Sequence, residues 1–422
     1  MKRIINFILC AVLIMTSFSV FSGCSADKRE NTLKLFSQGA YFDESLFEEF
    51  EEWYEEKSGK KITVTMEDFN SNEDMYNKVS MAKADYDLIC PSDYMIQKMI
   101  RENLIIEIDK SIIDISEEDL FVEDYIEATK LFDPDLKYSV PFMYGTFGIM
   151  TNIKFAGRVY DKWEDLLAND DKEQILYLKY SMRDTYSAAS IFSKSDELLA
   201  MPFSTQTEKS AYKATIQSIF SDTSTENIAN VKSILKQWKG KNRLWDDEDG
   251  KFAMADNRGT AGLFWSCDAG YVMSDYENDA GVELEGNKNL WFVIPKEGGN
   301  VYLDSFVISK YAKNVEAAQY FLQFICSKEA ALRNSEYIGA VSPVKEAYDE
   351  LKEALEAEEI DGEDSTFCDF PDYYSDELKQ AWKEMYIEML FPSHDTLMRC
   401  GQMVDYVKAE DAVMRAMTEV LS

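Results

Sequence analysis

Strand-like and helix-like segments alternate in the N-terminal part of the chain, and this alternation restricts the fold more than any other feature of the sequence. Apolar and polar residues alternate over residues 33–35, 62–66 and 86–90, a pattern typical of strands. Between them, residues 43–59 place their apolar side chains on one helical stripe and end at a glycine, and residues 72–83 form a second helical segment. This β-α-β-α-β order predicts an α/β fold, with a parallel sheet that carries helices on both faces.

Three loops follow the predicted strands and precede the predicted helices. They are Ser37–Tyr41, Phe69–Glu73 and Pro91–Tyr94. In open α/β sheets, ligands bind at the edge formed by the carboxyl ends of the parallel strands. We therefore expect a binding site at these loops.

The middle of the chain continues with strands and helices. Residues 138–152 are a strand-like run that Pro141 and Gly145 interrupt. Further strand-like runs cover 261–266 and 301–309, and mainly helical segments cover 194–247 and 314–329. The pattern extends the α/β prediction beyond the first sheet.

The chain is strongly acidic. Its 422 residues hold 44 Lys and Arg against 78 Asp and Glu, which gives a formal net charge of −34. Binding to nucleic acid depends largely on clustered cations, so a chain this acidic is a poor candidate for it, and we expect no basic patch that would bind anionic lipid. A single histidine, His394, excludes sites that need a histidine pair, such as a zinc HExxH motif. The negative charge indicates either a solvated surface or a field that favours cationic ligands.

The N-terminus predicts export and a lipid anchor. Lys2 and Arg3 precede an uncharged run, and small residues then lead to Cys24. The segment before Cys24 resembles the lipobox of bacterial lipoproteins, although Phe21 stands where that pattern prefers Leu. We expect a signal peptide over 1–23, lipidation of Cys24, and a tether over 24–32 that holds the protein on the outer face of the cytoplasmic membrane or in the periplasm. The alternative is a plain secretory signal followed by an ordinary cysteine.

The remaining cysteines do not indicate a disulfide framework or a metal site. Five lie beyond Cys24, at positions 90, 267, 326, 368 and 400, and no CxxC spacing occurs. Five cysteines cannot all pair within one chain, so we expect buried free thiols.

Five segments follow one another along the chain: FNSNEDMY at 69–76, YDL and PSDY at 86–94, YSVP and YG at 138–145, WEDL at 163–166, and PKEGG and YLDS at 295–305. In this order they resemble bacterial spermidine/putrescine-binding proteins of ABC importers. Together they extend over most of residues 33–345, whereas the part beyond about residue 345 matches poorly.

The resemblance implies the two-lobed periplasmic-binding-protein fold of type II, in which each lobe is a mostly parallel sheet with flanking helices and the chain crosses twice between the lobes. Lobe 1 would comprise residues 33–145 and 304–340, and lobe 2 residues 146–303 and 341–422. A polyamine of the putrescine or spermidine type would bind between the lobes of a monomer, which would deliver it to an ABC permease. Catalysis, a cofactor and a metal are not expected.

The resemblance also implies which residues bind the ligand. Aromatic walls would come from Tyr41, Tyr94, Trp265 and Tyr302. Asp184 and Asp304 would bind the amines, and Ser92 would add a hydrogen bond.

Four positions depart from the family pattern. Gln38 stands in place of a Trp, Ser181 in place of an acidic residue, Ala340 near the place of a Tyr, and Tyr302 in place of another Trp. Despite these departures, a polyamine remains the expected class of ligand. They weaken the case for spermidine in particular.

Other functions remain open from the sequence. The same fold binds ferric iron, sugars or aminophosphonates, and Tyr373 and Tyr374 are candidate oxygen ligands for iron. They lie in an acidic stretch, 352–377, for which we expect a loop-like surface excursion. A secreted hydrolase with paired carboxylates and a lipoprotein adhesin are further alternatives. No GxSxG, P-loop or dinucleotide motif supports an enzyme.

Overall fold

The computed structural model describes residues 29–421 except 114, 116–118, 241, 247–248, 278–281 and 363–364. The predicted signal peptide and Cys24 lie outside the described residues. Within the described part, no helix is long and apolar enough to cross a membrane.

The N-terminal part forms the parallel sheet that the sequence predicts. Strand β1 (Thr32–Gln38) pairs in parallel with β2 (Thr63–Phe69) and with β3 (Leu88–Ile89). The connecting helices are α3 (Leu46–Ser58), α4 (Asn72–Ser80) and α5 (Asp93–Arg101). Gly59 ends α3 in the left-handed region at φ 69°, a conformation that costs glycine little.

Helices cover both faces of this sheet. Leu35 of β1 belongs to the same buried cluster as Phe50 of α3. The next residue, Phe36, belongs to another cluster, together with Met75 of α4 and Met95 of α5. Because successive side chains of a strand point to opposite faces, the two clusters lie on opposite sides of the sheet.

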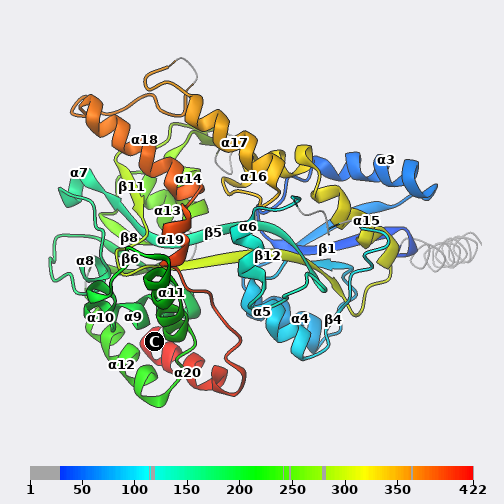
Figure 1. Cartoon of the computed structure of the whole chain (residues 1–422), viewed down its shortest axis with the longest axis horizontal. Helices are drawn as coiled ribbons and strands as arrows, with labels where there is room; N and C mark the ends of the chain where they lie inside the picture. The colour runs from blue at the N-terminus through cyan, green and yellow to red at the C-terminus, as the bar shows by residue number, and fades with distance from the viewer. Residues whose placement is uncertain are drawn as a thin grey trace, which may run out of the picture.

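Two long strands, β5 (Ser139–Asn152) and β12 (Asn300–Ser309), run through the molecule side by side and antiparallel. The sheet has the order β2-β1-β3-β12-β5-β8-β6-β7 and is mixed. The second part contains β6 (Leu176–Lys179), β7 (Arg243–Asp246) and β8 (Ala261–Trp265), with β6 parallel to both neighbours. Figure 1 shows two lobes joined by β5 and β12: a first lobe around β1 and a second lobe around β6 and β8.

The predicted interruptions at Pro141 and Gly145 do not end β5, which is continuous over fourteen residues. Instead, the pairing is irregular at this point, because Asp304 faces Met143 whereas Ser305 faces Pro141. A bulge tolerates a proline that cannot donate to the ladder. The Ser305 N–H donates to the Pro91 carbonyl oxygen at 3.2 Å and so ties β12 to the loop after β3.

The remaining elements cover the two lobes. In chain order they are β4 (Ile105–Ile106), α6 (Glu123–Thr129), α7 (Ile153–Ala156), α8 (Trp163–Leu167), α9 (Met182–Phe192), α10 (Ser195–Ala200), α11 (Gln206–Phe220), α12 (Thr225–Gln237), α13 (Asp249–Ala255), α14 (Ser266–Met273), β9 (Tyr276–Glu277), β10 (Glu283–Leu284), β11 (Leu290–Val293), α15 (Val315–Ile325), α16 (Lys328–Ile338), α17 (Lys345–Ala357), α18 (Asp376–Leu390), α19 (His394–Met398), the 3₁₀ turn η1 (Val407–Ala409) and α20 (Glu410–Leu421). The helix expected over 314–329 is therefore two helices, since Ser327 caps a new one by accepting from the Ala330 N–H.

The stretch 352–377 differs from the expected surface excursion. Helix α17 continues to Ala357, and the following loop buries the side chains of Phe367 and Tyr374. Phe367 packs edge-on against Trp382 of α18 with ring centroids 6.2 Å apart. The acidic residues dominated the composition of the segment, whereas its few aromatics decide its packing, because apolar burial provides most of the stabilisation.

Candidate ligand-binding site

Asp304 is a buried carboxylate at the bulge in β12. The Tyr41 hydroxyl, from the loop after β1, donates to Asp304 Oδ2 at 2.8 Å. Asp304 Oδ1 accepts no hydrogen bond from the described residues. Burial raises the pKa of Asp304 to about 6, as does the charge of Asp184, while the neighbouring Ser92, Tyr41 and Gln38 oppose the rise. The sequence-predicted pair Tyr41 and Asp304 is therefore in direct contact, with one carboxylate oxygen left for a donor.

Ser92 forms a backbone bridge with Asp304 and lies just before α5. Its hydroxyl accepts from the Asn72 amide at 3.0 Å, and its own N–H donates to Asn72 Oδ1 at 3.1 Å. Asn72, the first residue of α4, thus holds the loop after β3 in place.

Asp184 lies in the first turn of α9, directly after the carboxyl end of β6. Its N–H donates to the Ser181 hydroxyl at 3.3 Å, so Ser181 serves here as the helix cap. Trp265, the last residue of β8, donates from Nε1 to Asp184 Oδ1 at 3.4 Å. Burial raises the pKa of Asp184, and the charge of Glu73 adds to this, while Ser181, Trp265 and Lys179 oppose it.

Tyr94 of α5 contacts two charged residues that the sequence analysis missed. Its hydroxyl donates to Glu73 Oε1 at 3.2 Å, and the Arg183 guanidinium lies over its ring at 4.0 Å from the centroid. Arg183 Nε also donates to Glu73 Oε1 at 3.2 Å. Arg183 belongs to α9 of the second lobe and Glu73 to α4 of the first, so this ion pair joins the lobes. Glu73 lies inside the quoted segment 69–76 and Arg183 directly precedes the predicted Asp184, but nothing local marks the two as partners.

Lys179 is the third charged residue that the sequence analysis missed. It is buried at the end of β6, and its ammonium lies 4.3 Å from the centroid of the Trp265 ring. It forms ion pairs with Asp268 at 2.8 Å and with Asp246 at 3.6 Å. The Lys179 ammonium thus covers one face of the Trp265 ring, which the sequence analysis predicted as an aromatic contact for the ligand.

Tyr302 lies on β12, two residues before Asp304, and its hydroxyl donates to the Cys267 sulfur at 3.3 Å. Gly145 faces it on the neighbouring strand β5. A Cβ atom at residue 145 would collide with the Tyr302 hydroxyl and with Ser266 Oγ. Glycine is therefore needed at this position so that Tyr302 can pack against the strand.

The structure places most of the sequence-predicted residues at the carboxyl ends of two sets of strands, one in each lobe, and β1 and β3 run opposite to β6 and β8. Tyr41, Ser92, Asp184 and Trp265 lie at or just after the carboxyl ends of β1, β3, β6 and β8. Of the positions that depart from the family pattern, Gln38 ends β1, Ser181 caps α9 and Ala340 is buried. Gln402 was not foreseen; its amide donates to the buried carboxyl group of Asp93 at 3.2 Å.

The model of bacterial extracellular solute-binding proteins matches residues 45–360 of the chain. The chain belongs to this family. Among curated relatives of this solute-binding protein, the spermidine/putrescine-binding periplasmic protein of Salmonella typhimurium is 27% identical over 315 residues, 74% of this chain and 78% of the relative. The putrescine-binding periplasmic protein PotF of Escherichia coli is 22% identical over 68% of this chain and 71% of its own length.

Solved structures confirm the two-lobed periplasmic-binding-protein fold. A putative spermidine/putrescine ABC transporter protein from Listeria monocytogenes has a TM-score of 0.65 and 26% identity, with 93% of this chain and 99% of that chain covered. The Tp0655 lipoprotein of Treponema pallidum has a TM-score of 0.64 and 20% identity, with 92% and 99% covered. The predicted family and fold class are confirmed, and the roles assigned to individual site residues stay predictions.

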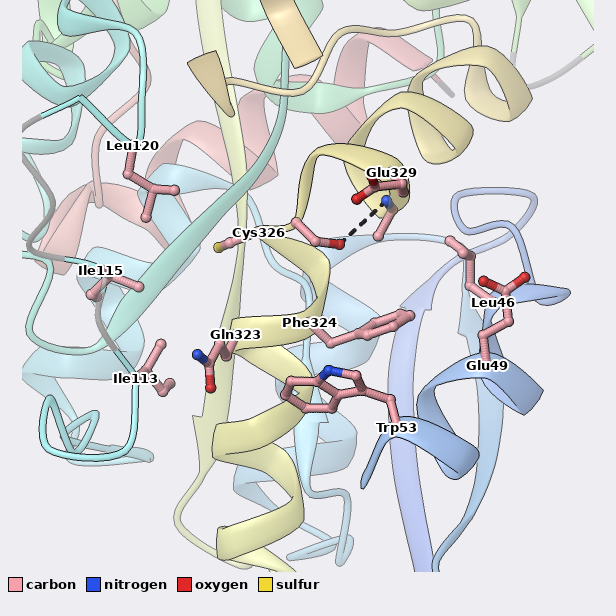
Figure 2. A pocket seen from close by; sticks show the side chains of 12 residues that line it. Leu46, Glu49, Trp53, Ile113, Ile115, Leu120, Gln323, Phe324, Cys326 and Glu329 are labelled. Atoms are coloured by element: carbon pink, nitrogen blue, oxygen red, sulfur yellow. Dashed lines mark hydrogen bonds between the residues drawn. The ribbon is translucent and has the colours of Figure 1, made fainter. Parts of the chain in front are cut away.

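A cavity of about 440 Å³ lies away from the predicted residues of this solute-binding protein. Figure 2 shows it between Trp53 of α3, Phe324 of α15 and Leu120, so it belongs to the first lobe. None of its lining residues was predicted from the sequence as a ligand contact, and none contacts Asp184 or Asp304 through a hydrogen bond or ion pair in the described part of the chain.

Tyr374, one of the two tyrosines that suggested iron, has a structural role, whereas Tyr373 is exposed. The Tyr374 hydroxyl donates to the Lys288 carbonyl oxygen at 2.7 Å and accepts from Trp291 Nε1 at 2.9 Å. The described residues contain no group of three or more His, Cys, Asp or Glu side chains arranged to hold a metal ion. All five cysteines beyond Cys24 are free thiols, of which Cys90 and Cys400 are buried.

Proposed function

We propose that the chain captures a polyamine between its two lobes, where the carboxyl ends of their strands lie, and delivers it to the permease of an ABC importer. A polyamine is an aliphatic chain with protonated amines, so it needs buried carboxylates for its charges and aromatic rings for its methylenes. The observation that carries the proposal is Asp304, which is 3% exposed and whose Oδ1 accepts no hydrogen bond from any residue that the structure describes. The names of the curated relatives support the same ligand class.

The energetic argument favours a cationic ligand over a neutral one. An ionised carboxylate that is buried without a counter-ion costs several kcal/mol, roughly 3–5 when a partner is removed. An ammonium group that reaches Asp304 Oδ1 would offset that cost through a charge-assisted hydrogen bond. A neutral sugar could donate a hydroxyl but would leave the charge uncompensated.

Movement of the two lobes towards each other around the ligand would couple ligand binding to transport. The ion pair between Glu73 and Arg183 already joins the lobes, and β5 and β12 provide the two crossing strands. In our proposal, lobe 1 comprises 33–145 and 304–340, and lobe 2 the remainder, with the ligand between them. The closed monomer would then dock on the permease, without catalysis.

The cellular part of the proposal concerns Cys24. We expect cleavage before this residue and lipidation of its thiol, which would hold the protein on the outer face of the cytoplasmic membrane. Mass spectrometry of the mature N-terminus tests this. A mature chain that retains Ser22 or lacks acyl groups would contradict it.

Calorimetry tests the ligand class directly. The protein would lack residues 1–23, carry Cys24→Ser, and be titrated with putrescine, spermidine, ferric citrate and a neutral sugar. We expect one-to-one binding of an amine that weakens as salt rises, because the interaction is between charges. Binding of the sugar or iron complex, with no response to any amine, would overturn the proposal.

A further inference from the structure

The last part of the chain is attached to the second lobe at two points. The Gly401 N–H donates to the Gly299 carbonyl oxygen, just before β12, at 3.0 Å. Further on, α20 packs on α12, and Val413 of α20 lies in the same buried cluster as Leu235 of α12. Residues 402–410 connect these two points, and we name them the C-terminal strap. In Figure 1 this segment runs between α19 and α20 on the side that faces the first lobe.

The strap contacts the first lobe through one stripe of α5. Gln402 Nε2 donates to Asp93 Oδ2 at 3.2 Å, and the Asp405 N–H donates to Gln97 Oε1 at 2.8 Å. Asp405 also accepts from Arg101 Nε at 2.7 Å. The three residues of α5 are spaced four positions apart, so they lie on one side of the helix. This side of α5 is therefore held by a segment that is attached to the other lobe.

Glu410, the last residue of the strap, binds one cation from each lobe. Its Oε2 accepts from Lys98 of α5 at 2.8 Å, and its Oε1 accepts from Arg183 of α9 at 3.1 Å. The side chains of Lys98, Arg183 and Glu410 are 10%, 4% and 17% exposed. Water screens ion pairs at this depth less than surface pairs, and removal of one partner costs more. One carboxylate thus holds cations of the two lobes together.

Arg183 also contacts one aromatic ring of the first lobe and one of the strap. Its guanidinium lies 4.0 Å from the centroid of Tyr94 and 4.5 Å from that of Tyr406. Tyr94 belongs to α5 and moves with the first lobe. Separation of the lobes therefore breaks the contacts of α5 with Arg183 and with the strap in the same movement.

We propose that the C-terminal strap is a latch that holds the two lobes together, with Glu410 as the positioning residue between Lys98 and Arg183. Without the charge of Glu410, two cations would face each other across the lobes, so this carboxylate replaces a repulsion by an attraction. A ligand between the lobes leaves only after they separate, and the latch therefore slows its release. The effect on release rests on the proposed function, whereas the latch itself needs no particular ligand.

Hydrogen exchange in the ligand-free protein tests the latch directly. The Asp405 N–H is bonded to Gln97 of the first lobe, whereas the Gln402 N–H donates to Gln217 of the second lobe at 3.0 Å. Mass spectrometry with fragmentation would resolve the two amides in the protein that lacks residues 1–23 and carries Cys24→Ser. We expect Glu410→Gln to speed exchange at Asp405 about tenfold or more, and to leave Gln402 unchanged.

Two other results at these amides would overturn the latch. Unchanged exchange at Asp405 would show that Glu410 does not hold the lobes together. Equally faster exchange at Gln402 would show that the strap frays from the second lobe, rather than that the lobes separate.

Glu419→Gln is the matched control. Glu419 lies on the same helix as Glu410 and also pairs with a lysine, but its partner Lys232 belongs to α12 of the second lobe. The same chemical change at this position should leave exchange at Asp405 unchanged. An equal effect of both variants would assign the effect to the packing of α20 and would overturn the latch.

Lys98→Met tests the latch from the first lobe and leaves α20 unaltered, so it also decides the question if Glu410→Gln does not fold. We expect faster exchange at Asp405 in this variant too. The variant that combines both substitutions should exchange no faster than Glu410→Gln alone, because it retains no second cation to repel Arg183. Effects of the two substitutions that add would overturn the role of Glu410 between these cations.

Stopped-flow kinetics with putrescine connects the latch to ligand release. We expect Glu410→Gln to release putrescine about tenfold faster, with association changed by less than about twofold, because the latch opposes separation of the lobes. Unchanged release would overturn the control of release. If neither the unaltered protein nor the variants bind any amine, the proposed function fails, and hydrogen exchange still decides whether the latch exists.

Discussion

Tyr41 donates its hydroxyl proton to Asp304 Oδ2 at 2.8 Å, although the two residues are 263 positions apart in the sequence. One oxygen of the carboxylate is thereby fixed, while Oδ1 has no hydrogen-bond partner in the described part of the chain. This arrangement leaves one oxygen of a buried carboxyl group without a donor among the described residues.

Asp304→Asn should weaken amine binding and stabilise the ligand-free protein at the same time. An amine would lose its charge-assisted partner, so we expect putrescine affinity to fall by about tenfold or more. Because burial raises the pKa of Asp304 to about 6, its ionised form costs up to about 3 kcal/mol of folding free energy above that pH. Calorimetry and thermal melts at pH 8 measure both effects. Asp372→Asn, at an exposed position, is the control and should change neither; an Asp304 variant that binds normally would remove Asp304 from the site.

Amine affinity should depend on pH through Asp304. The raised pKa means that Asp304 binds a proton more tightly in the folded than in the unfolded chain, so its contribution to stability is present at low pH and is lost as pH rises through about 6. Amine binding has the opposite dependence, since it needs the ionised carboxylate. We expect affinity to rise between pH 5 and pH 7 by about tenfold and then to level off. A flat profile in titrations over this range would contradict the assignment.

Tyr41→Phe should weaken binding less than Asp304→Asn. The substitution keeps the ring but removes the donor to Asp304 Oδ2, which is worth about 1–2 kcal/mol for a hydrogen bond to a charged group. Since Tyr41 favours the ionised form of Asp304, its loss should also raise the pKa of the carboxyl group further. The midpoint of the pH profile should therefore move upward. An unchanged midpoint would indicate that Tyr41 acts only by packing.

Gly145→Ala should disturb Tyr302 without touching any charge. The added methyl group would collide with the Tyr302 hydroxyl and with Ser266 Oγ, so we expect a loss of about 1–3 kcal/mol in the free energy of unfolding. Urea titration measures the loss. Combining it with Tyr302→Phe should restore part of the stability, because the hydroxyl oxygen is removed. If the double variant is as unstable as the sum of the two single ones, the collision lies elsewhere.

The sequence by itself determined the local elements of the first lobe and the edge of its sheet at which the proposed ligand contacts Tyr41 and Ser92 lie. The alternation of strands and helices placed β1, β2 and β3 in parallel, and parallel strands bring their carboxyl ends to one edge. The residues after those strands, among them Tyr41 and Ser92, therefore belong near one another whatever the rest of the fold does. Local periodicity and family motifs were sufficient to predict that these residues lie near one another.

Only the tertiary structure decided how the charges are distributed. Lys179 lies over Trp265 within the second lobe, Arg183 contacts Tyr94 and Glu73 of the first lobe, and Glu410 contacts Arg183 from the C-terminal helix. Ion pairs depend on distances in space and on burial, neither of which a sequence pattern encodes. The same reason explains the segment 352–377. Its acidic composition predicted a solvent-exposed loop, but the side chain of Phe367 is packed in the core. Which carboxylates are left for a ligand is therefore a property of the folded chain alone.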